Sequence, residues 1–360
     1  MFCIDKISIT QFKNYPRALF HFDQRITCIT GVNGVGKTNL LDAVYYLCFT
    51  KSYFSKTDQQ NISFGESGFR IEGEFVLNNE VRTAICIMRE NGKKEFILDD
   101  KIYERFSHHV GKFPCIIVAP DDVYIIIGGG ESRRRYIDAL LCQTDANYLQ
   151  QLIDYNRTLQ QRNSLLRSIS EGGRTDNHLL EVYDEQMIRS GIYVYETRKT
   201  LLHQLVPMIR QLYNDLAGSI EPIEIEYVSQ LSQNDFKELL RQYRSRDISS
   251  LRTNAGIHKD DLEVIFHGQL FRNTASQGQR KSLLFALKLA EFELLRVHKG
   301  YPPILLLDDV FEKLDEGRMS NLLTEVCVKN RGQVLITDSH RDRITTHFDR
   351  LGASYQLVTL

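Results

Sequence analysis

The sequence predicts an α/β fold with mixed sheets, in which an antiparallel pair of helices is inserted between two β-rich parts of the chain. Short β-rich runs separated by polar turns fill residues 2–30 and 69–118. Helical periodicity dominates residues 132–218, with one break at Glu171-Gly172-Gly173-Arg174. Apolar strand-like runs return at 304–307 and 334–337. We therefore expect a split head, 1–130 plus 251–360, and an inserted helical arm, 131–250.

The composition is typical of a globular protein with a large core. The chain has 360 residues, of which 42% are hydrophobic and 25% charged, with a formal net charge of −1. This near-neutrality excludes a global positive field, so binding to nucleic acid needs a local patch or a surface completed by a second subunit. The seven cysteines are scattered without a C-x-x-C pair, which indicates reduced thiols in a cytoplasmic protein. We expect no signal peptide, because the start Met1-Phe2-Cys3-Ile4-Asp5-Lys6 follows a strand pattern. We also expect no membrane partner, and no apolar run is long enough to span a bilayer.

The individual elements follow from periodicity and turn residues. A helix is expected at about 39–50, before a polar loop at Lys51–Gln60, and a further helix is expected at Asp235–Arg246. The expected strands before the arm are Phe2–Ile9, Ala18–Phe22, Ile26–Thr30, Phe69–Leu77, Val81–Arg89, Glu95–Leu98 and Cys115–Val118. Later strands are expected at Ile223–Val228, at Leu262–Phe266 and at Gln269–Arg272, the last two as a hairpin.

One stretch fills every fixed position of the phosphate-loop pattern G-x-x-x-x-G-K-[ST]: Gly31-Val32-Asn33-Gly34-Val35-Gly36-Lys37-Thr38. A β-rich run precedes it, and Asn39 begins an apolar-periodic helix. In that context the loop is expected to bind the phosphates of ATP through backbone N–H groups and Lys37, and Thr38 is expected to hold Mg²⁺. A glycine-rich turn without a ligand is the alternative, and it is disfavoured because strand, loop and helix all agree.

A second apolar run ends in two carboxylates. Ile304–Leu307 reads as a buried strand, and Asp308 and Asp309 follow it. Ligands of α/β proteins bind at the carboxyl ends of parallel strands, so Asp308 is a candidate Mg²⁺ ligand. Asp309 is a candidate to orient or deprotonate the attacking water, and Lys37 and Asp309 are the expected catalytic residues. Buried strands often end in Asp, so this pair of carboxylates indicates a nucleotide site only in combination with the phosphate loop.

Ser276-Gln277-Gly278-Gln279 precedes the apolar-periodic helix Leu283–Leu295. An ordinary capped helix would explain it, but S-x-G-Q upstream of a hydrophobic strand ending in Asp-Asp resembles the signature motif of ABC-type ATPases. The resemblance implies that Ser276, Gly278 and Gln279 of one subunit contact ATP held by another, in an ATP-dependent homodimer. Asp315 matches the D-loop position of that superfamily.

Further segments resemble the RecF family of bacterial recombination-repair ATPases, with an ABC-type, SMC-like head. They are Phe12-Lys13-Asn14-Tyr15, Asn39-Leu40-Leu41-Asp42-Ala43, Lys51-Ser52-Tyr53, Ala119-Pro120-Asp121-Asp122-Val123, Gly128, Arg133-Arg134-Arg135-Tyr136-Ile137-Asp138 and Gly256-Ile257-His258-Lys259-Asp260-Asp261-Leu262. The resemblance runs from residue 2 to about 340 and implies recognition of gapped DNA and single-strand/double-strand junctions. It also implies cooperation with RecR and RecO in loading RecA, and slow, DNA-stimulated ATP hydrolysis.

Other readings remain open at this point. A membrane transporter's ATP-binding subunit would be more compact between the phosphate loop and Asp308, and a metabolic kinase would lack the S-x-G-Q signature.

This sequence departs from the pattern of related ATPase heads at two places. Pro120-Asp121-Asp122 replaces the glutamine that senses Mg²⁺, so that Asp121 or Asp122 would have to substitute. His340 comes late for a γ-phosphate contact, and a surface position is an equal alternative.

The residues that contact DNA are the feature that the sequence determines least. Acidic and basic residues are nearly balanced over 131–255, so the arm as a whole is no electrostatic platform. Arg133, Arg134 and Arg135 at a helix start are candidates for phosphate contacts. Pairing with acids in the head, or contact with nucleotide across a dimer, is an alternative of at least equal weight. Arg241, Arg244 and Arg246 form a second cluster, for which a solvated helix face is the ordinary explanation.

Overall fold

A computed structural model describes residues 2–170, 177–310 and 316–360. The chain forms two compact units. The head unit comprises Met1–Val123, Gln211–Ile220 and Ser276–Leu360, and the arm unit comprises Tyr124–Arg210 and Glu221–Ala275. These bounds differ from the expected division at 130/131 and 250/251. The main reason is strand β10 (Asp261–Phe266), which pairs along its whole length with β9 (Ile223–Val228) inside the arm unit.

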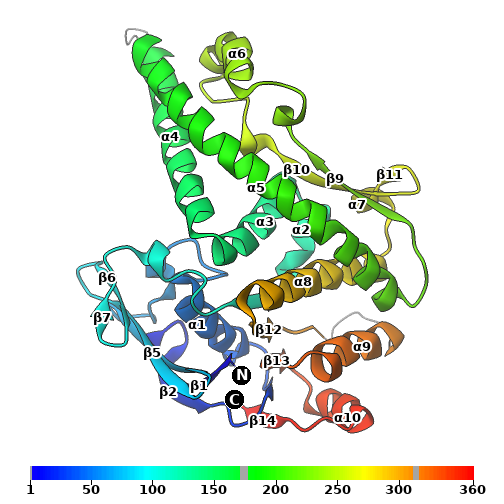
Figure 1. The fold of residues 1–360 in the computed structure, drawn as a ribbon. Coiled ribbons are helices and arrows are strands. Elements are labelled where there is room, and N and C mark those ends of the chain that lie inside the picture. Colours follow the sequence, from blue (N-terminus) through cyan, green and yellow to red (C-terminus); the bar gives the residue numbers. More distant parts are fainter. Residues whose placement is uncertain (1, 171–176, 311–315) are drawn as a thin grey trace. The chain divides into compact units, whose positions relative to one another are not determined.

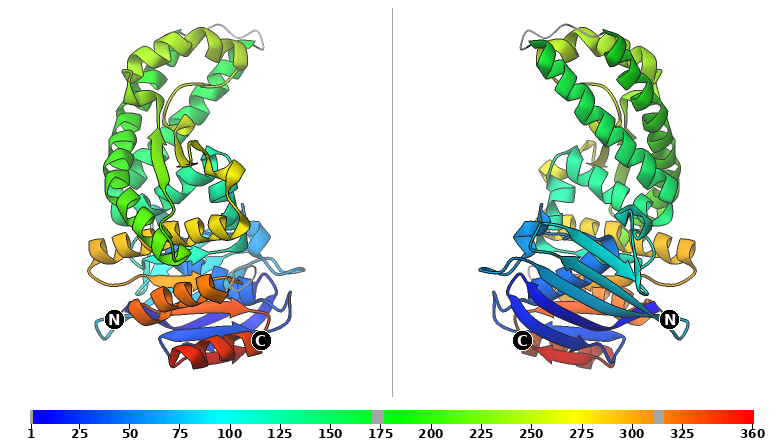
Figure 2. Two further views of the ribbon diagram at one scale, coloured as in Figure 1. Left: turned by 90° about the vertical axis from the view of Figure 1, so that its right-hand side faces the viewer. Right: turned by 90° about the vertical axis from the view of Figure 1, so that its left-hand side faces the viewer.

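One sheet of the head unit is an antiparallel meander with the strand order β2-β1-β4-β5-β6-β7. Figure 2 shows its blue and cyan strands side by side. The strands are β1 (Phe2–Phe12), β2 (Tyr15–His21), β4 (Phe69–Leu77), β5 (Glu80–Met88), β6 (Lys94–Leu98) and β7 (Lys101–Ile102). Strands β1 and β2 are longer than predicted. Pro16 does not interrupt β2, because β2 is an edge strand and its unpaired side needs no N–H donor.

The second sheet of the head unit is parallel throughout, with the strand order β14-β3-β13-β12-β8. Its strands are β3 (Ile26–Thr30), β8 (Cys115–Val118), β12 (Ile304–Leu307), β13 (Val334–Asp338) and β14 (Gln356–Thr359). Every residue of β3, β8, β12 and β13 is buried, as expected for strands covered on both faces. The carboxyl ends of β3 and β12 meet at one edge, and this brings the phosphate loop to Asp308.

Helix α1 (Lys37–Phe49) lies between the two sheets and completes the core of the head unit. One buried cluster contains Leu40, Val44 and Leu47 of α1 together with Ile4 of β1 and Leu306 of β12. The remaining helices of the unit are α8 (Gln277–Lys299), α9 (Glu316–Leu323) and α10 (Arg341–Leu351), with the 3-10 turns Asp58–Asn61, Phe106–His108 and Pro120–Asp122 and the π-helical turn Thr324–Lys329 (Figure 1).

The arm unit is built on two long antiparallel helices, α4 (Ala146–Ser170) and α5 (Asn177–Ala217), the latter continuing into the head unit. Side-chain contacts show the direction: Arg162 meets Asp184, and Tyr148 meets Arg198, so that one residue number falls as the other rises. The predicted Gly-Gly turn lies outside the described residues. The other elements are α2 (Val123–Ile127), α3 (Gly130–Thr144), α6 (Phe236–Ser250), α7 (Phe271–Thr274), β11 (Gln269–Leu270) and the turns Gln230–Ser232 and Ile257–Lys259.

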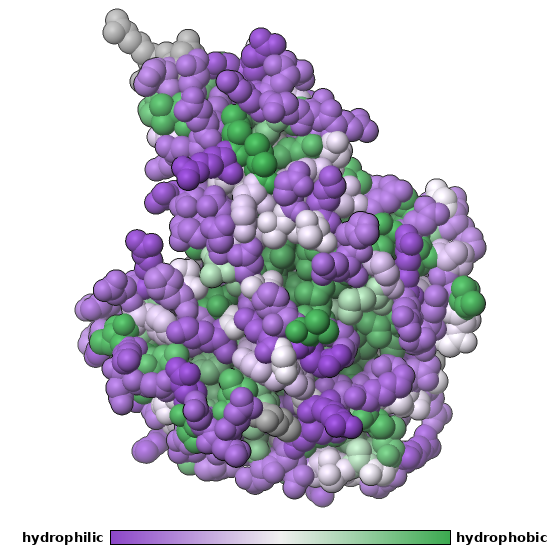
Figure 3. Space-filling view, viewed as in Figure 1, coloured by the Kyte–Doolittle hydropathy of each residue, from purple (hydrophilic) through white to green (hydrophobic). Residues whose placement is uncertain are grey.

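Within the described ranges, no helix combines the length and the apolar character needed to cross a bilayer. The face of the molecule drawn in Figure 3 is mainly hydrophilic, with apolar side chains scattered over it.

Candidate functional site

The phosphate loop leaves β3 at Thr30 and enters α1 at Lys37, as its sequence context predicts. Gly36 is required there for two reasons. Its φ of 121° lies in the region that side chains disfavour, and an added Cβ would come within 3 Å of the Asn14 amide and the Tyr15 hydroxyl. Asn14 Nδ2 donates to Val35 O at 2.8 Å, and Tyr15 Oη donates to Gly36 O at 3.0 Å. The β1–β2 hairpin therefore supports the loop.

Lys37 is a buried cation that lies over the loop. Its Nζ donates to Gly31 O at 2.6 Å and to Val32 O at 3.1 Å. Among the residues that the structure describes, no carboxylate forms an ion pair with this ammonium. A buried positive charge that is satisfied by carbonyl oxygens suits a polyanionic ligand, because phosphate oxygens would supply the missing opposite charge. The cradle therefore fits the phosphates predicted for it.

Thr38 and Asp308 meet as the paired motifs predict, although most of the chain separates them. Thr38 Oγ1 donates to Asp308 Oδ2 at 2.9 Å and lies 3.0 Å from Oδ1. Asp308 also accepts from Thr337 Oγ1 at 2.7 Å. Burial raises the pKa of Asp308, and the hydrogen bonds from Thr337 and Thr38 act against that rise. A hydroxyl and a carboxylate oxygen side by side are donors of the kind that Mg²⁺ prefers, so the residues fit the predicted metal.

Asp309 follows directly and has a left-handed backbone, with φ of 48°. Its N–H donates to Thr337 Oγ1 at 2.9 Å. This hydroxyl therefore contacts both acidic residues and fixes the turn at the end of β12. Reasoning from the sequence assigned Thr337 no role, although a polar residue at the carboxyl end of a parallel strand is a signal that could have identified it.

Ser276 caps α8, as predicted, through a reciprocal pair of hydrogen bonds. Its Oγ accepts from Gln279 N at 3.2 Å, and its own N–H donates to Gln279 Oε1 at 2.9 Å. Ser276 is exposed, and the atoms nearest to a Cβ built on Gly278 belong to Arg318 of α9, at 3.6 Å and beyond. Ser276 is thus exposed at the N-terminus of α8, and Gly278 and Gln279 are half-buried. Asp315 lies outside the described residues.

The turn between β1 and β2, which contacts the loop through Asn14, also contacts α1 through two polar pairs. Asn39 Nδ2 donates to Asn14 Oδ1 at 2.7 Å, and Lys13 Nζ pairs with Asp42 Oδ2 at 2.5 Å. The role of Tyr15 was missed, because only the folded hairpin brings its hydroxyl to Gly36.

Asp122 is buried and its carboxylate is already engaged. It accepts from Ala119 N at 2.9 Å and from the Tyr53 hydroxyl, and it pairs with Lys288 Nζ at 3.3 Å. Because these contacts occupy the Asp122 carboxylate, they do not support a role for Asp122 as the Mg²⁺ sensor. Asp121 is exposed. His340 is also exposed and begins α10. No contact tests the predicted γ-phosphate role of His340.

The prediction that Arg133, Arg134 and Arg135 contact DNA requires a correction at Arg133. Arg133 is 5% exposed, and its guanidinium binds Asp261 at 2.6 and 2.9 Å as well as Ile125 O and Gly128 O. All three nitrogens of this guanidinium donate within the arm unit, and this explains the burial of Arg133 by structure rather than by contact with DNA. Arg134 is half-buried and donates to Asp260 O, and Arg135 is exposed and pairs with Glu131.

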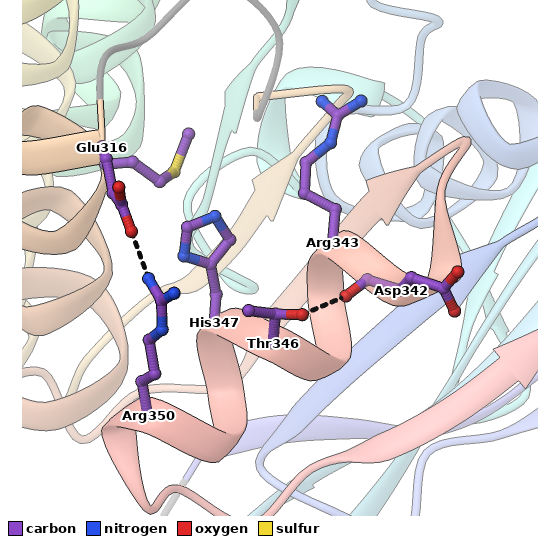
Figure 4. A pocket seen from close by; sticks show the side chains of 7 residues that line it. Glu316, Asp342, Arg343, Thr346, His347 and Arg350 are labelled. Carbon is purple, nitrogen blue, oxygen red and sulfur yellow. Dashed lines mark hydrogen bonds and ion pairs between the residues drawn. The ribbon is translucent and has the colours of Figure 1, made fainter.

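A separate open pocket of about 500 Å³ lies between α9 and α10. Figure 4 shows Glu316 and Arg350 joined by an ion pair, with His347 and Arg343 on the same side of α10. The pocket shares no lining residue with the phosphate loop and has no part in the site described above.

Comparison with known proteins agrees with this geometry. A family model described as an AAA domain matches residues 6–265. The DNA replication and repair protein RecF of Flavobacterium johnsoniae is 38% identical over 357 residues, with 99% of both chains covered. RecF of Cytophaga hutchinsonii is 39% identical over 96% of this chain and 91% of its own.

Solved structures give the same result. The structure of the recombination mediator protein RecF-ATP in the RecFOR pathway has a TM-score of 0.87 at 28% identity, covering 94% of this chain and 92% of that one. The Smc head domain of Pyrococcus furiosus has a TM-score of 0.54 at 14% identity, over 96% and 92% of the two chains, and shows likeness of fold alone. The predicted fold class, an ABC-type, SMC-like P-loop ATPase head with mixed sheets and an inserted antiparallel helical arm, is confirmed. The chain belongs to the RecF family of DNA replication and repair proteins.

Proposed function

We propose that this protein is an ATP-dependent DNA-binding protein of recombinational repair. The observation that carries the proposal is the buried Lys37 ammonium above the Gly31–Thr38 loop, in a chain that resembles RecF along nearly its whole length. Lys37 would bind the β- and γ-phosphates of ATP. The backbone N–H groups of the loop and Asn39, the next residue after it, would bind the remaining phosphate oxygens.

Thr38 and Asp308 would hold Mg²⁺, which supplies positive charge to the phosphates when it is bound. Asp309 would accept a proton from the attacking water, or orient that water, at the end of β12. Hydrolysis by one chain alone is expected to be slow, because one subunit lacks donors that close over the nucleotide. The protein is thus a weak ATPase used as a switch.

A homodimer would complete each site. Ser276, Gly278 and Gln279 of the partner subunit would contact the nucleotide from the opposite side, and Asp315 would communicate between the two sites. The support is the exposure of Ser276 at the N-terminus of α8, because N–H groups at a helix N-terminus attract anions.

The DNA substrate would be gapped DNA with a single-strand/double-strand junction, and RecR and RecO would be the partners in loading RecA. The support is relationship: a solved relative is described as a recombination mediator of the RecFOR pathway. We expect a cytoplasmic protein that hydrolyses ATP faster when it is bound to DNA.

Rates of ATP hydrolysis with and without gapped DNA, together with a gel shift in ATP and in ADP, test the proposal. A DNA-stimulated rate and ATP-dependent binding are expected. A rate that ignores DNA, with no shifted band, would instead favour the alternative function, an ATP-binding subunit of a membrane transporter. The full-length likeness to RecF does not favour that alternative.

A further inference from the structure

Four cations of the arm unit gather on one surface, which we call the basic patch: Arg134, Arg246, Arg252 and Lys259. They come from three separate segments. Arg134 lies on α3, Arg246 lies near the C-terminal end of α6 with Arg252 just beyond that helix, and Lys259 ends the turn Ile257–Lys259. Arg246, Arg252 and Lys259 are exposed, and Arg134 is half-buried.

Hydrogen bonds hold these segments together. Arg134 Nη1 donates to Asp260 O, the carbonyl next to Lys259. The His258 ring bonds to Thr253 O at 3.1 Å, next to Arg252, and Arg252 N–H donates to Asp247 O at 3.2 Å, next to Arg246. The backbones that carry the four cations are therefore fixed to one another before any ligand arrives.

Acidic residues near the basic patch are already used inside the fold. Asp247 is fully buried and pairs with Arg162 at 2.7 Å, and Asp260 is buried against Arg198 at 3.1 Å and the Tyr227 hydroxyl at 2.5 Å. Throughout the described ranges, no carboxylate forms an ion pair with any of the four cations. Two other exposed arginines of the arm unit differ: Arg135 pairs with Glu131, and Arg241 pairs with Glu238.

The cations repel one another in the absence of a ligand. Partial burial lowers the pKa of Lys259, and the neighbouring charges of Arg252, Arg134 and Arg246 lower it further, whereas Asp247 opposes them. Burial also lowers the pKa of His258 to about 4, so its ring is neutral near pH 7 and adds no charge. A ligand with several negative charges would relieve this repulsion at all four positions at once.

We propose that the basic patch binds the sugar-phosphate backbone of DNA, an inference that rests on the proposed DNA-binding function. The net charge of the chain is −1, so its overall charge does not attract DNA. A local group of cations without ion-pair partners, already held in place, would instead bind the polyanion. Three guanidinium groups and one ammonium match phosphate chemistry, and contacts of this kind carry no sequence preference.

The test uses the full-length triple variant Arg246→Ala/Arg252→Ala/Lys259→Ala, with Arg134 kept because it bonds to Asp260 O. Binding of fluorescein-labelled gapped DNA is followed by anisotropy, in ATP, across a salt series. Arg241→Ala is the matched control, since Arg241 is an exposed cation of the same α6 whose charge is already paired. Thermal unfolding checks that each variant is folded.

We expect the slope of log K against log salt to become shallower by about 0.9 for each lost duplex phosphate contact, and therefore by about 3 for the triple variant. Affinity at 0.1 M salt should then fall by roughly 10- to 500-fold. The control should keep both values. A folded triple variant with wild-type affinity and slope would overturn the inference while leaving the proposed function intact.

Two other results separate the possibilities. A wild-type protein that binds no DNA in ATP would refute the proposed function, and the basic patch proposal with it. A triple variant that keeps DNA binding but loses binding to polyglutamate would identify the basic patch as a site for an acidic protein, and this also overturns the inference.

Discussion

The Asn14 side chain offers a sharp test of how the β1–β2 hairpin supports nucleotide binding. It makes two hydrogen bonds at the phosphate loop: Nδ2 donates to Val35 O at 2.8 Å, and Oδ1 accepts from Asn39 Nδ2 at 2.7 Å. Asn14→Ala removes both and leaves the fixed motif residues unchanged. A neutral hydrogen bond contributes about 0.5–1.5 kcal/mol, and exposed ones lie near the lower end, so the loss is about 1–1.5 kcal/mol.

If that free energy holds the loop in its binding geometry, the Kd for ATP should rise by about 5- to 10-fold. Titration with a fluorescent ATP analogue measures it. Asn91→Ala is the matched control, because Asn91 also occupies an exposed hairpin turn, where its Oδ1 accepts from Lys93 N, remote in the chain from the phosphate loop. Equal Kd values for Asn14→Ala and wild type would show that the hairpin does not support the loop.

Two further substitutions test other parts of the site, and a third tests a buried carboxyl in the head unit. Lys37→Ala should weaken ATP binding by more than about 100-fold, because it removes the buried charge that faces the phosphates; a Kd within a factor of two of wild type would exclude Lys37 from the site. Ser276→Arg should bind ATP normally as a monomer but fail to dimerise in ATP on sedimentation, and dimer formation by this variant would contradict the cross-subunit role. Glu291 is buried, and burial raises its pKa from 4.5 to about 7, with Lys288 opposing the rise and Asp122 adding to it. Between pH 4.5 and about 7, the Glu291 carboxyl is protonated in the folded chain but ionised in the unfolded chain. Its contribution to the free energy of unfolding is therefore complete below pH 4.5 and is lost as the pH rises through about 7. Glu291→Gln should therefore be more stable than wild type by about 3 kcal/mol at pH 8 and nearly equal at pH 4.5 in urea unfolding; equal stability at both pH values would contradict this.

The parts of the site that sequence reasoning predicted are those that short motifs determine. The loop, the acidic strand end and the cap at Ser276 each depend on neighbours within a few residues, so their context can be read along the chain. The contact between Thr38 and Asp308 was also predictable, because parallel strands bring their carboxyl ends to one edge.

The missed features depend on packing between distant segments. Consecutive residues on a helix point about 100° apart, so Arg133, Arg134 and Arg135 span about 200° and one of them can face the interior while another faces solvent. Sequence alone did not tell which one, because Asp261, the partner of Arg133, comes from β10. The pairing of β10 with β9 also places β10 in the arm unit rather than in the head. About 30 residues separate the two strands, so no short stretch of sequence indicates that they pair.

The central claim is that ATP joins two copies of this chain, because the signature residues of one copy complete the site of the other. Sedimentation velocity of the wild-type protein in ATP, in ADP and without nucleotide tests it most directly. We predict a dimer in ATP and a monomer in the other two conditions. A monomer in saturating ATP, with nucleotide bound, would contradict the account.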